Sequence, residues 1–226
     1  MKPRLVDYAV IGVAGVWAYL AFPLVISRHI YFTRELPNPA YPRTLNDKLL
    51  WRKVFDRNPD FVALSDKIES QNIARQNCDE VLVPKVLWIG SSPQKIPDAV
   101  LEGNVVVKAT HGSGYTYPVF AGKYNREELE KLAARWLART YGKRHGEWGY
   151  FGVKPRLFVE EMILDDEGGY RTTEAKVYIY CGKLGKTSMI YDRQSGQPTS
   201  DAYTEDWQHT GTTSPLGLPR AHRAAP

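Results

Sequence analysis

A lysine that precedes a glycine-containing loop is the first stretch of this sequence that could do chemistry. Residues 105–107 are three valines, whose stiff, β-branched side chains favour a buried strand. Lys108 follows them, and Gly112 and Gly114 flank Ser113 in the loop beyond. Backbone N–H groups of such a loop can converge on one anion, and the lysine adds positive charge beside it. The stretch therefore predicts a strand and loop that hold a phosphate group.

Charged side chains also interrupt two other apolar runs that look like strands. Lys176 lies in residues 174–181, whose other positions look buried, and Glu160 and Glu161 lie in residues 156–163. Burying an unpaired ammonium or carboxylate group is costly, so each of them needs a partner. Two interpretations stay open for the lysines, an anionic ligand or structural pairing with the glutamates. The glutamates themselves either contact a base, a ribose or a lysine, or belong to an edge strand with one solvated side chain.

Three further motifs have a chemical interpretation beside a structural one. Residues 185–187, Gly-Lys-Thr, match the end of a P-loop, but position 180 is Tyr180 and a strand follows, so we interpret them as a hairpin turn. Asp165 and Asp166 could bind a metal ion as in a glycosyltransferase, but before two glycines a solvated turn is the commoner interpretation. His111 could act as a general acid or base, although no partner is evident in the sequence.

The composition is that of a folding protein with a basic balance. The 226 residues suffice for one large domain or two small lobes, and 43% of them are hydrophobic. The net charge of +5 suits a nucleotide, an acidic polymer or a membrane surface, and a solvated basic surface explains it equally well. The basic residues form no dense stripe, so no nucleic-acid partner is expected. Cys78 and Cys181 lie far apart in sequence, which favours two free thiols in a reducing compartment.

The N-terminal region contains an uncharged, mostly apolar run over residues 8–26. As a helix it is just long enough to cross a hydrocarbon core of about 30 Å, although Pro23 should kink its last turn. We therefore expect residues 1–30 to form a hydrophobic helix and candidate membrane anchor. Arg28 and Arg34 follow it, which places the rest of the chain on the cytoplasmic side. The alternative is a helix that packs on the domain.

The remaining elements follow from prolines, caps and periodicity. Prolines mark residues 31–43 as a linker, Thr44 and Asp47 form a capping box, and Asn125 caps an amphipathic helix. Residues 44–208 form the main domain, and residues 209–226 are predicted to be a disordered tail. The expected helices are residues 44–56, 61–76 and 125–137, and the expected strands are residues 80–90, 104–109, 117–120, 156–163, 174–181 and 187–192.

The ordered motifs along residues 44–208 resemble the ATP-grasp family similar to teichuronopeptide-biosynthesis proteins, which is found with surface-polysaccharide enzymes. The resemblance implies an α+β fold in which two lobes with antiparallel sheets and flanking helices hold ATP between them. The motifs are Leu45-Asn46-Asp47-Lys48, Phe55-Asp56-Arg57-Asn58-Pro59, Ser65-Asp66-Lys67, Val107-Lys108-Ala109-Thr110-His111-Gly112-Ser113-Gly114, Glu147-Trp148, Lys154-Pro155-Arg156, Val159-Glu160-Glu161-Met162-Ile163, Lys176, Tyr191-Asp192-Arg193 and Asp206-Trp207.

The same resemblance implies roles for individual residues. Lys67 and Lys108 correspond to the phosphate-binding lysines, and Lys176 and Arg193 are the implied catalytic residues, with Lys176 near the γ-phosphate. Two segments complete the implied ATP site: the loop over the phosphates, with His111, Gly112, Ser113 and Gly114, and the adenine-binding hinge, with Glu160, Glu161 and Ile163.

The sequence also departs from the family pattern. Gln71 stands where the family usually has an arginine, and Glu174-Ala175 stands before Lys176 in place of Asp-Tyr. The family carries its Mg²⁺-binding carboxylates beyond Asp206-Trp207, where this sequence has residues 209–226. We therefore expect an incomplete second lobe, in which ligands for Mg²⁺ are not identifiable.

Three functional hypotheses follow. The first is an ATP-dependent ligase of cell-surface polysaccharide or peptide-polymer biosynthesis, which joins a carboxylate to an amine through an acyl phosphate. Its expected partners are ATP, a carboxylate- or sugar-containing acceptor, and a membrane. The second is a nucleotide-binding remnant or scaffold at the membrane without catalysis. The third is a glycosyltransferase of polysaccharide synthesis that uses Asp165 and Asp166.

Overall fold

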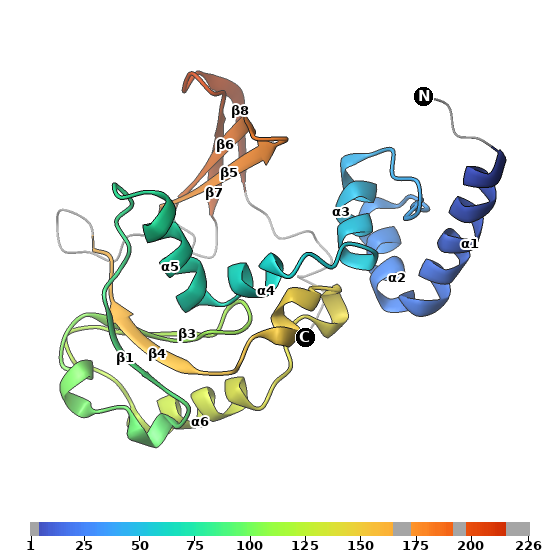
Figure 1. The fold of residues 1–226 in the computed structure, drawn as a ribbon. Helices are drawn as coiled ribbons and strands as arrows, with labels where there is room; N and C mark the ends of the chain where they lie inside the picture. The colour runs from blue at the N-terminus through green and yellow to red at the C-terminus, as the bar shows by residue number, and fades with distance from the viewer. Residues whose placement is uncertain (1–4, 165–172, 192–197, 216–226) are drawn as a thin grey trace. The chain divides into compact units, whose positions relative to one another are not determined.

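The computed structural model describes residues 5–164, 173–191 and 198–215 (Figure 1). The chain divides into two units, which are described separately below: the first comprises Met1–Met162 and the second Ile163–Pro226. Of the described residues, the first unit contains all that form helices, together with one antiparallel sheet, and the second contains another antiparallel sheet. The α+β class with two antiparallel sheets agrees with the sequence-based prediction.

The first unit begins with three helices, α1 (Leu5–Ala21), α2 (Pro23–Thr33) and α3 (Leu45–Val54). The single helix predicted over residues 8–26 is instead two helices, because Pro23 lacks an N–H group and starts a new helix. The capping box of Thr44 and Asp47 is present at the start of α3. A small core joins the three helices, and its buried residues are Ala18, Val25, Ile26, Leu50 and Val54.

The helix predicted over residues 61–76 is also divided, into α4 (Asp60–Ser65) and α5 (Lys67–Asn77). Asp66 between them has an extended backbone, and its carboxylate accepts hydrogen bonds from the backbone N–H groups of Ile68 and Glu69 at 2.9 and 3.4 Å. This carboxylate satisfies donors of the first turn and so begins α5. The sequence periodicity alone gave no sign of this interruption.

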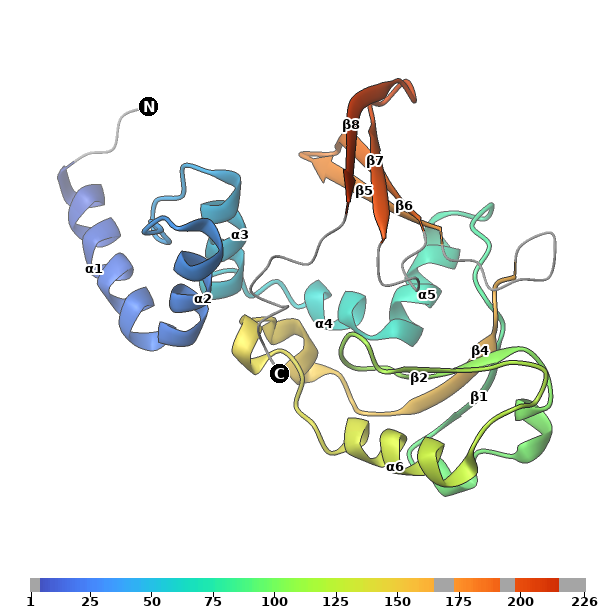
Figure 2. The same ribbon diagram turned by 180° about the vertical axis from the view of Figure 1, so that it is seen from behind.

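The sheet of the first unit has the strand order β1-β4-β2-β3, with every neighbouring pair antiparallel. Helices α5 and α6 (Arg126–Leu137) lie on opposite faces of it (Figure 1, Figure 2). Buried residues of α6 pack against alternate residues of β2 and β4. The strands are β1 (Val86–Gly90), β2 (Val105–Ala109), β3 (Thr116–Val119) and β4 (Leu157–Glu161), and the short 3-10 helices are η1 (Pro93–Lys95), η2 (Asp98–Leu101), η3 (Lys143–His145) and η4 (Trp148–Gly152).

The sheet of the second unit is an antiparallel meander of β5 (Glu174–Tyr180), β6 (Lys183–Tyr191), β7 (Thr199–Tyr203) and β8 (His209–Pro215). It corrects two predictions. Residues 209–215 form β8 and pair with β7, so the prediction of disorder is wrong there, because ladder hydrogen bonds need no apolar periodicity. The hairpin turn lies at Cys181-Gly182, whose φ values of 52° and 78° suit a type I′ turn, and residues 185–187 belong to β6.

Cys78 and Cys181 are both free and exposed. No single helix among the described residues is long and apolar enough to cross a bilayer. Helices α1 and α2 satisfy the length and composition criteria only as a pair, Asp7–Ala21 and Pro23–Thr33, which is bent by 95°.

Candidate functional site

The face of the first sheet that is turned away from α6 carries a lysine and a carboxylate. Val105, Val107 and Ala109 of β2 belong to the core with α6, so Lys108 points to the other face. In the β2–β4 ladder Lys108 is opposite Phe158, and Val106 is opposite Glu160. Lys108 and Glu160 are therefore diagonal neighbours on one face, within reach of long side chains.

Lys108 and Glu160 form an ion pair, with Lys108 Nζ donating to Glu160 Oε1. The side chain of Glu160 is only 3% exposed, whereas that of Lys108 is 28% exposed. Glu160 Oε2 accepts a second hydrogen bond, of 2.7 Å, from Nε2 of Gln71 on α5. Both oxygens of this buried carboxylate are thus satisfied, as burial of a charge requires. The pairing fixes the position of Lys108, which keeps contact with solvent.

Lys67, the first residue of α5, contacts the loop that follows β2. Its ammonium group donates to the carbonyl oxygens of Ala109, at 2.8 Å, and Gly112, and its backbone N–H donates to Thr110 O at 3.1 Å. Among the described residues Lys67 forms no ion pair. Burial, and then the charge of Lys108, lower the pKa of Lys67 from 10.5 to about 8. The carboxylates of Asp66 and Glu160 offset part of this effect, and the hydrogen bonds of the Lys67 ammonium group go to carbonyl oxygens.

A second ion pair, between Arg156 and Asp66, fixes the start of α5 and thereby the position of Lys67. Nη2 of Arg156 lies 3.0 Å from Oδ2 of Asp66, the residue that caps α5. The backbones of Arg156 and Thr110 also hydrogen-bond, with Thr110 N donating to Arg156 O at 2.9 Å. Asp66 and Arg156 hold the start of α5 against the loop and so position Lys67. Neither residue is among the site residues predicted from the sequence, although both lie in motifs that carry the family resemblance.

The loop residues differ in their surroundings. His111 is 2% exposed, and its Nε2 lies 2.9 Å from the carbonyl oxygen of Trp136 near the end of α6. Burial lowers the pKa of His111, so the ring is neutral and donates from Nε2 to that carbonyl. Gly112 has a φ of 87°, and a Cβ there would lie 2.8 Å from Tyr141. Ser113 and Gly114 form the exposed tip, where the φ of Gly114 is 76°.

The predicted hinge coincides with the division between the units. Glu161 is exposed, and its backbone N–H donates to Lys85 O at 3.0 Å. Met162 is buried, and its N–H donates to Asn104 O at 3.1 Å. The first unit ends at Met162, and Ile163, the first residue of the second unit, is exposed. The chain is therefore fastened to the first sheet up to the residue at which the units divide.

The predicted catalytic residues belong to the second unit. Lys176 is exposed on β5, opposite Ser188 of β6. The expectation that its neighbours are buried is wrong, because Val177 and Ile179 are 54% and 57% exposed. Arg193 lies outside the described residues, and so do Asp165 and Asp166.

The residues of the first unit suit a polyphosphate better than a metal ion. Lys67, Lys108 and the exposed tip at Ser113 and Gly114 combine positive charge with backbone that can turn its N–H groups toward an anion. Among the described residues no three His, Cys, Asp or Glu side chains come together as a metal site, so no ligand for Mg²⁺ is assigned. The assembled groups can bind and neutralise phosphates.

A helix-borne lysine, a strand-borne lysine and a glycine loop on an antiparallel sheet define a protein of the ATP-grasp class. A family model described as TupA-like ATPgrasp matches residues 47–216, about three quarters of the chain, and the protein belongs to this family. The match confirms the resemblance found in the sequence and includes β8, which lies beyond the predicted domain boundary at residue 208. No curated protein and no solved structure matches the chain significantly.

Proposed function

We propose that the protein binds ATP through Lys67, Lys108 and the loop at residues 112–114, and uses it to join a carboxylate to an amine in cell-surface polysaccharide or peptide-polymer biosynthesis. The convergence of the two lysines beside the loop, within an ATP-grasp protein, carries this proposal. Lys67 has only carbonyl partners among the described residues and a lowered pKa, so a triphosphate beside it would relieve the repulsion from Lys108.

The proposed reaction has two steps. A carboxylate oxygen of the acceptor attacks the γ-phosphorus, and the bond from that phosphorus to the β-phosphate oxygen breaks, which yields an acyl phosphate and ADP. The amine nitrogen then attacks the acyl carbon, inorganic phosphate leaves, and the amine gives up a proton to solvent. Lysines that neutralise the transferred phosphoryl group supply positioning and charge stabilisation. Lys176 and Arg193 are the proposed catalytic residues, and residues 161–163 are the proposed adenine contact.

The proposed location is the cytoplasmic side of a membrane. Helix α1 supports it, because most of its side chains are apolar and exposed and Asp7 is its only charged residue. Large apolar surfaces without cover in a folded protein mark interaction sites. The proposed acceptor carries a carboxylate or a sugar and is a precursor of a surface polymer.

The binding step is tested by thermal unfolding with and without ATP. At about 100 times its Kd, ATP should raise the melting temperature by roughly 5–10 °C. A Lys108→Met, Glu160→Gln double variant should lose this shift; it removes both charges of the ion pair, so no unpaired charge is left buried, and Lys67 stays in place. Lys123→Met removes an exposed lysine and serves as the control. An unchanged shift in the double variant, or none in the wild type, would overturn the proposal.

The ligase step needs its own measurement. ADP release in the presence of an acyl acceptor and an amine, trapped with hydroxylamine as the acyl hydroxamate, reports the acyl phosphate. ATP binding without ADP release over a panel of carboxylate acceptors would favour the scaffold hypothesis over the ligase.

A further inference from the structure

Helix α1 packs against α2 and α3 along one face only. Ala18 belongs to the small core of these helices, Ile11, Ala14 and Gly15 on the same face are half-buried, and the side chains of the other face are exposed. A large apolar surface left exposed on a folded protein marks an interaction site. Its 17 residues span about 26 Å, somewhat less than a full hydrocarbon core. The exposed large side chains are Tyr8, Val10, Val13, Val16, Trp17, Tyr19 and Leu20.

The chain turns by 95° after α1, and basic residues appear in the segment that follows, beginning with Arg28 of α2. Residues 23–57 contain seven lysines or arginines against three carboxylates, a net charge of +4 out of +5 for the whole chain. A cluster of four to eight basic residues directly after a membrane-inserted helix is the pattern that binds anionic lipid headgroups. These basic residues therefore follow the apolar helix α1 closely in sequence, and all of them lie beyond the bend.

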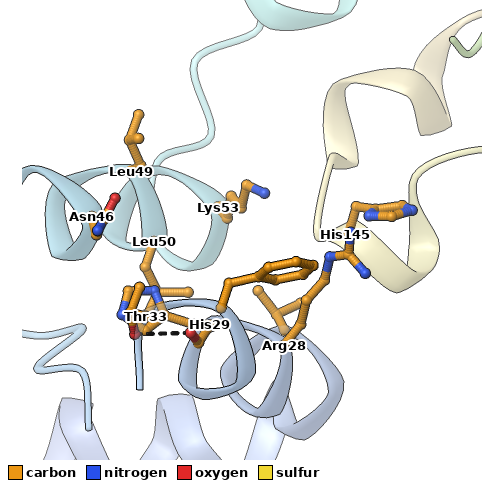
Figure 3. Close-up of a pocket in the computed structure, with 10 residues that line it drawn as sticks. Arg28, His29, Thr33, Asn46, Leu49, Leu50, Lys53 and His145 are labelled. Atoms are coloured by element: carbon orange, nitrogen blue, oxygen red, sulfur yellow. Dashed lines mark hydrogen bonds between the residues drawn. The ribbon is translucent and has the colours of Figure 1, made fainter. Parts of the chain in front are cut away.

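A basic pocket of about 200 Å³ lies between α2, α3 and η3 (Figure 3). Arg28 and His29 of α2, Lys53 of α3 and His145 of η3 contribute to its lining, and no carboxylate does. Neither Arg28 nor Lys53 forms an ion pair with any residue that the structure describes. The volume is smaller than the 300–1,000 Å³ usual for drug-sized ligands, so the pocket suits a small anionic group.

The surroundings of the pocket are also lined by basic side chains. A neighbouring hollow of about 520 Å³ shares Val25 and Lys53 with it and is also lined by Arg57 and Lys143, again without a carboxylate. The guanidinium of Arg28 lies 4.7 Å from the centroid of the Phe32 ring, which orients it at the pocket. An arginine and a lysine at one small pocket match the fork and point-charge modes by which proteins hold phosphate oxygens.

We infer that this pocket binds the phosphate group of an anionic phospholipid while α1 inserts into the same bilayer. The bend directs α1 into the lipid and leaves α2 along the surface, where Arg28 and Lys53 meet headgroups. The inference rests on the proposed membrane location and is independent of ATP binding.

Vesicle flotation of the full chain tests it. Wild type should bind vesicles of phosphatidylcholine with about 30% phosphatidylglycerol about tenfold or more tightly than phosphatidylcholine alone, since each basic side chain near an anionic surface adds to binding. An Arg28→Gln, Lys53→Gln double variant should lose that preference and keep its binding to neutral vesicles through α1. The swapped variant, Arg28→Lys with Lys53→Arg, should retain the preference and so shows that charge, not folding, is responsible.

Lys95→Gln with Lys131→Gln removes the same charge from exposed positions of the first unit and should behave as wild type. Equal lipid preference in the Arg28→Gln, Lys53→Gln variant, or equal loss in this control, would overturn the inference. Failure of the wild type to bind any vesicle would overturn the membrane location itself. Inorganic phosphate is the competing source of the same chemistry: a rise in wild-type melting temperature with phosphate, absent from the pocket variant and without vesicle binding, would assign the pocket to a soluble anion instead.

Discussion

The two antiparallel sheets place a lysine in opposite environments. In the first unit Lys108 lies on β2, whose four other residues are buried, and it pairs with the buried Glu160. In the second unit Lys176 lies on β5, an edge strand with exposed neighbours, and it forms no ion pair with any described residue. Each strand contains a single lysine next to a valine, and this local pattern does not separate them. Strand position and helix cover separate them, because β2 is an inner strand and has helices on both faces.

This contrast suggests a division of tasks. The proposed role of Lys108, binding of ground-state phosphates, requires a fixed position, which the ion pair with Glu160 provides. An exposed lysine on the other unit is suited to act only when the substrates are in place. We therefore expect substitutions in the first sheet to affect stability and ATP binding together, and substitutions of Lys176 to affect turnover alone.

The largest expected difference is between the two lysine environments themselves. Glu160→Ala leaves Lys108 without its carboxylate and Gln71 without an acceptor, and should lower the free energy of unfolding by about 3 kcal/mol, since one partner of a buried ion pair is lost. Lys176→Ala on the exposed strand should be indistinguishable from wild type. Urea titration measures both. Equal effects of the two changes would mean that the sheets do not differ as described.

Glycines in connections of the two sheets, Gly112 after β2 and Gly182 between β5 and β6, allow a similar comparison. Gly112 and Gly182 both have positive φ values, of 87° and 78°. A Cβ on Gly112 would lie 2.8 Å from Tyr141 and 2.9 Å from Tyr115. A Cβ on Gly182 would have no such neighbour within 4 Å among the described residues. Gly182→Ala should therefore cost about 1 kcal/mol of backbone strain, and Gly112→Ala about 2 kcal/mol or more. A smaller cost at Gly112 than at Gly182 in thermal unfolding would contradict the close packing of the loop at residues 112–114.

The smallest expected effect concerns pH. Burial lowers the pKa of His111 below its ordinary value of 6.5, so the unfolded chain binds this proton more readily than the folded one. The contribution of His111 to stability is therefore present above about pH 6.5 and declines as the pH falls below it. His111→Gln should flatten the pH dependence of the melting temperature in this range; His29, whose pKa is also lowered, is present in both proteins. Identical profiles would show that His111 is not held neutral by the fold.

Local sequence signals predicted much of the first unit. The capping box at Thr44, the valine strand before Lys108 and the amphipathic helix after Asn125 depend on neighbours within a few residues, and all are present. The helix breaks at Phe22 and Asp66 are harder to predict from the sequence, because the helical pattern of residues continues across each of them. Strand β8 was missed because its Gly-Thr-rich sequence lacks the alternation that marks half-buried strands.

The candidate site shows the same difference between what the sequence predicts and what only the structure shows. Lys67 and Lys108 were identified through the family resemblance, whereas the contacts that hold them join residues far apart in the chain. Gln71 and Glu160 are 89 positions apart, and Asp66 and Arg156 are 90 apart. No local pattern encodes such pairs. The strand order of the first sheet, in which β4 enters between β1 and β2, brings them together.

The most direct test of the account is calorimetric titration of the protein with ATP at about pH 7 and about pH 9.5. Lys67, whose pKa is about 8, is mostly charged at the first pH and mostly neutral at the second, and a bound triphosphate would raise its pKa. We predict measurable binding at pH 7 that weakens by up to about thirtyfold at pH 9.5, with no such weakening in Lys67→Arg. Equal affinity of the wild type at both pH values, or no binding at either, would contradict the assignment of Lys67 and Lys108 as the phosphate-binding lysines.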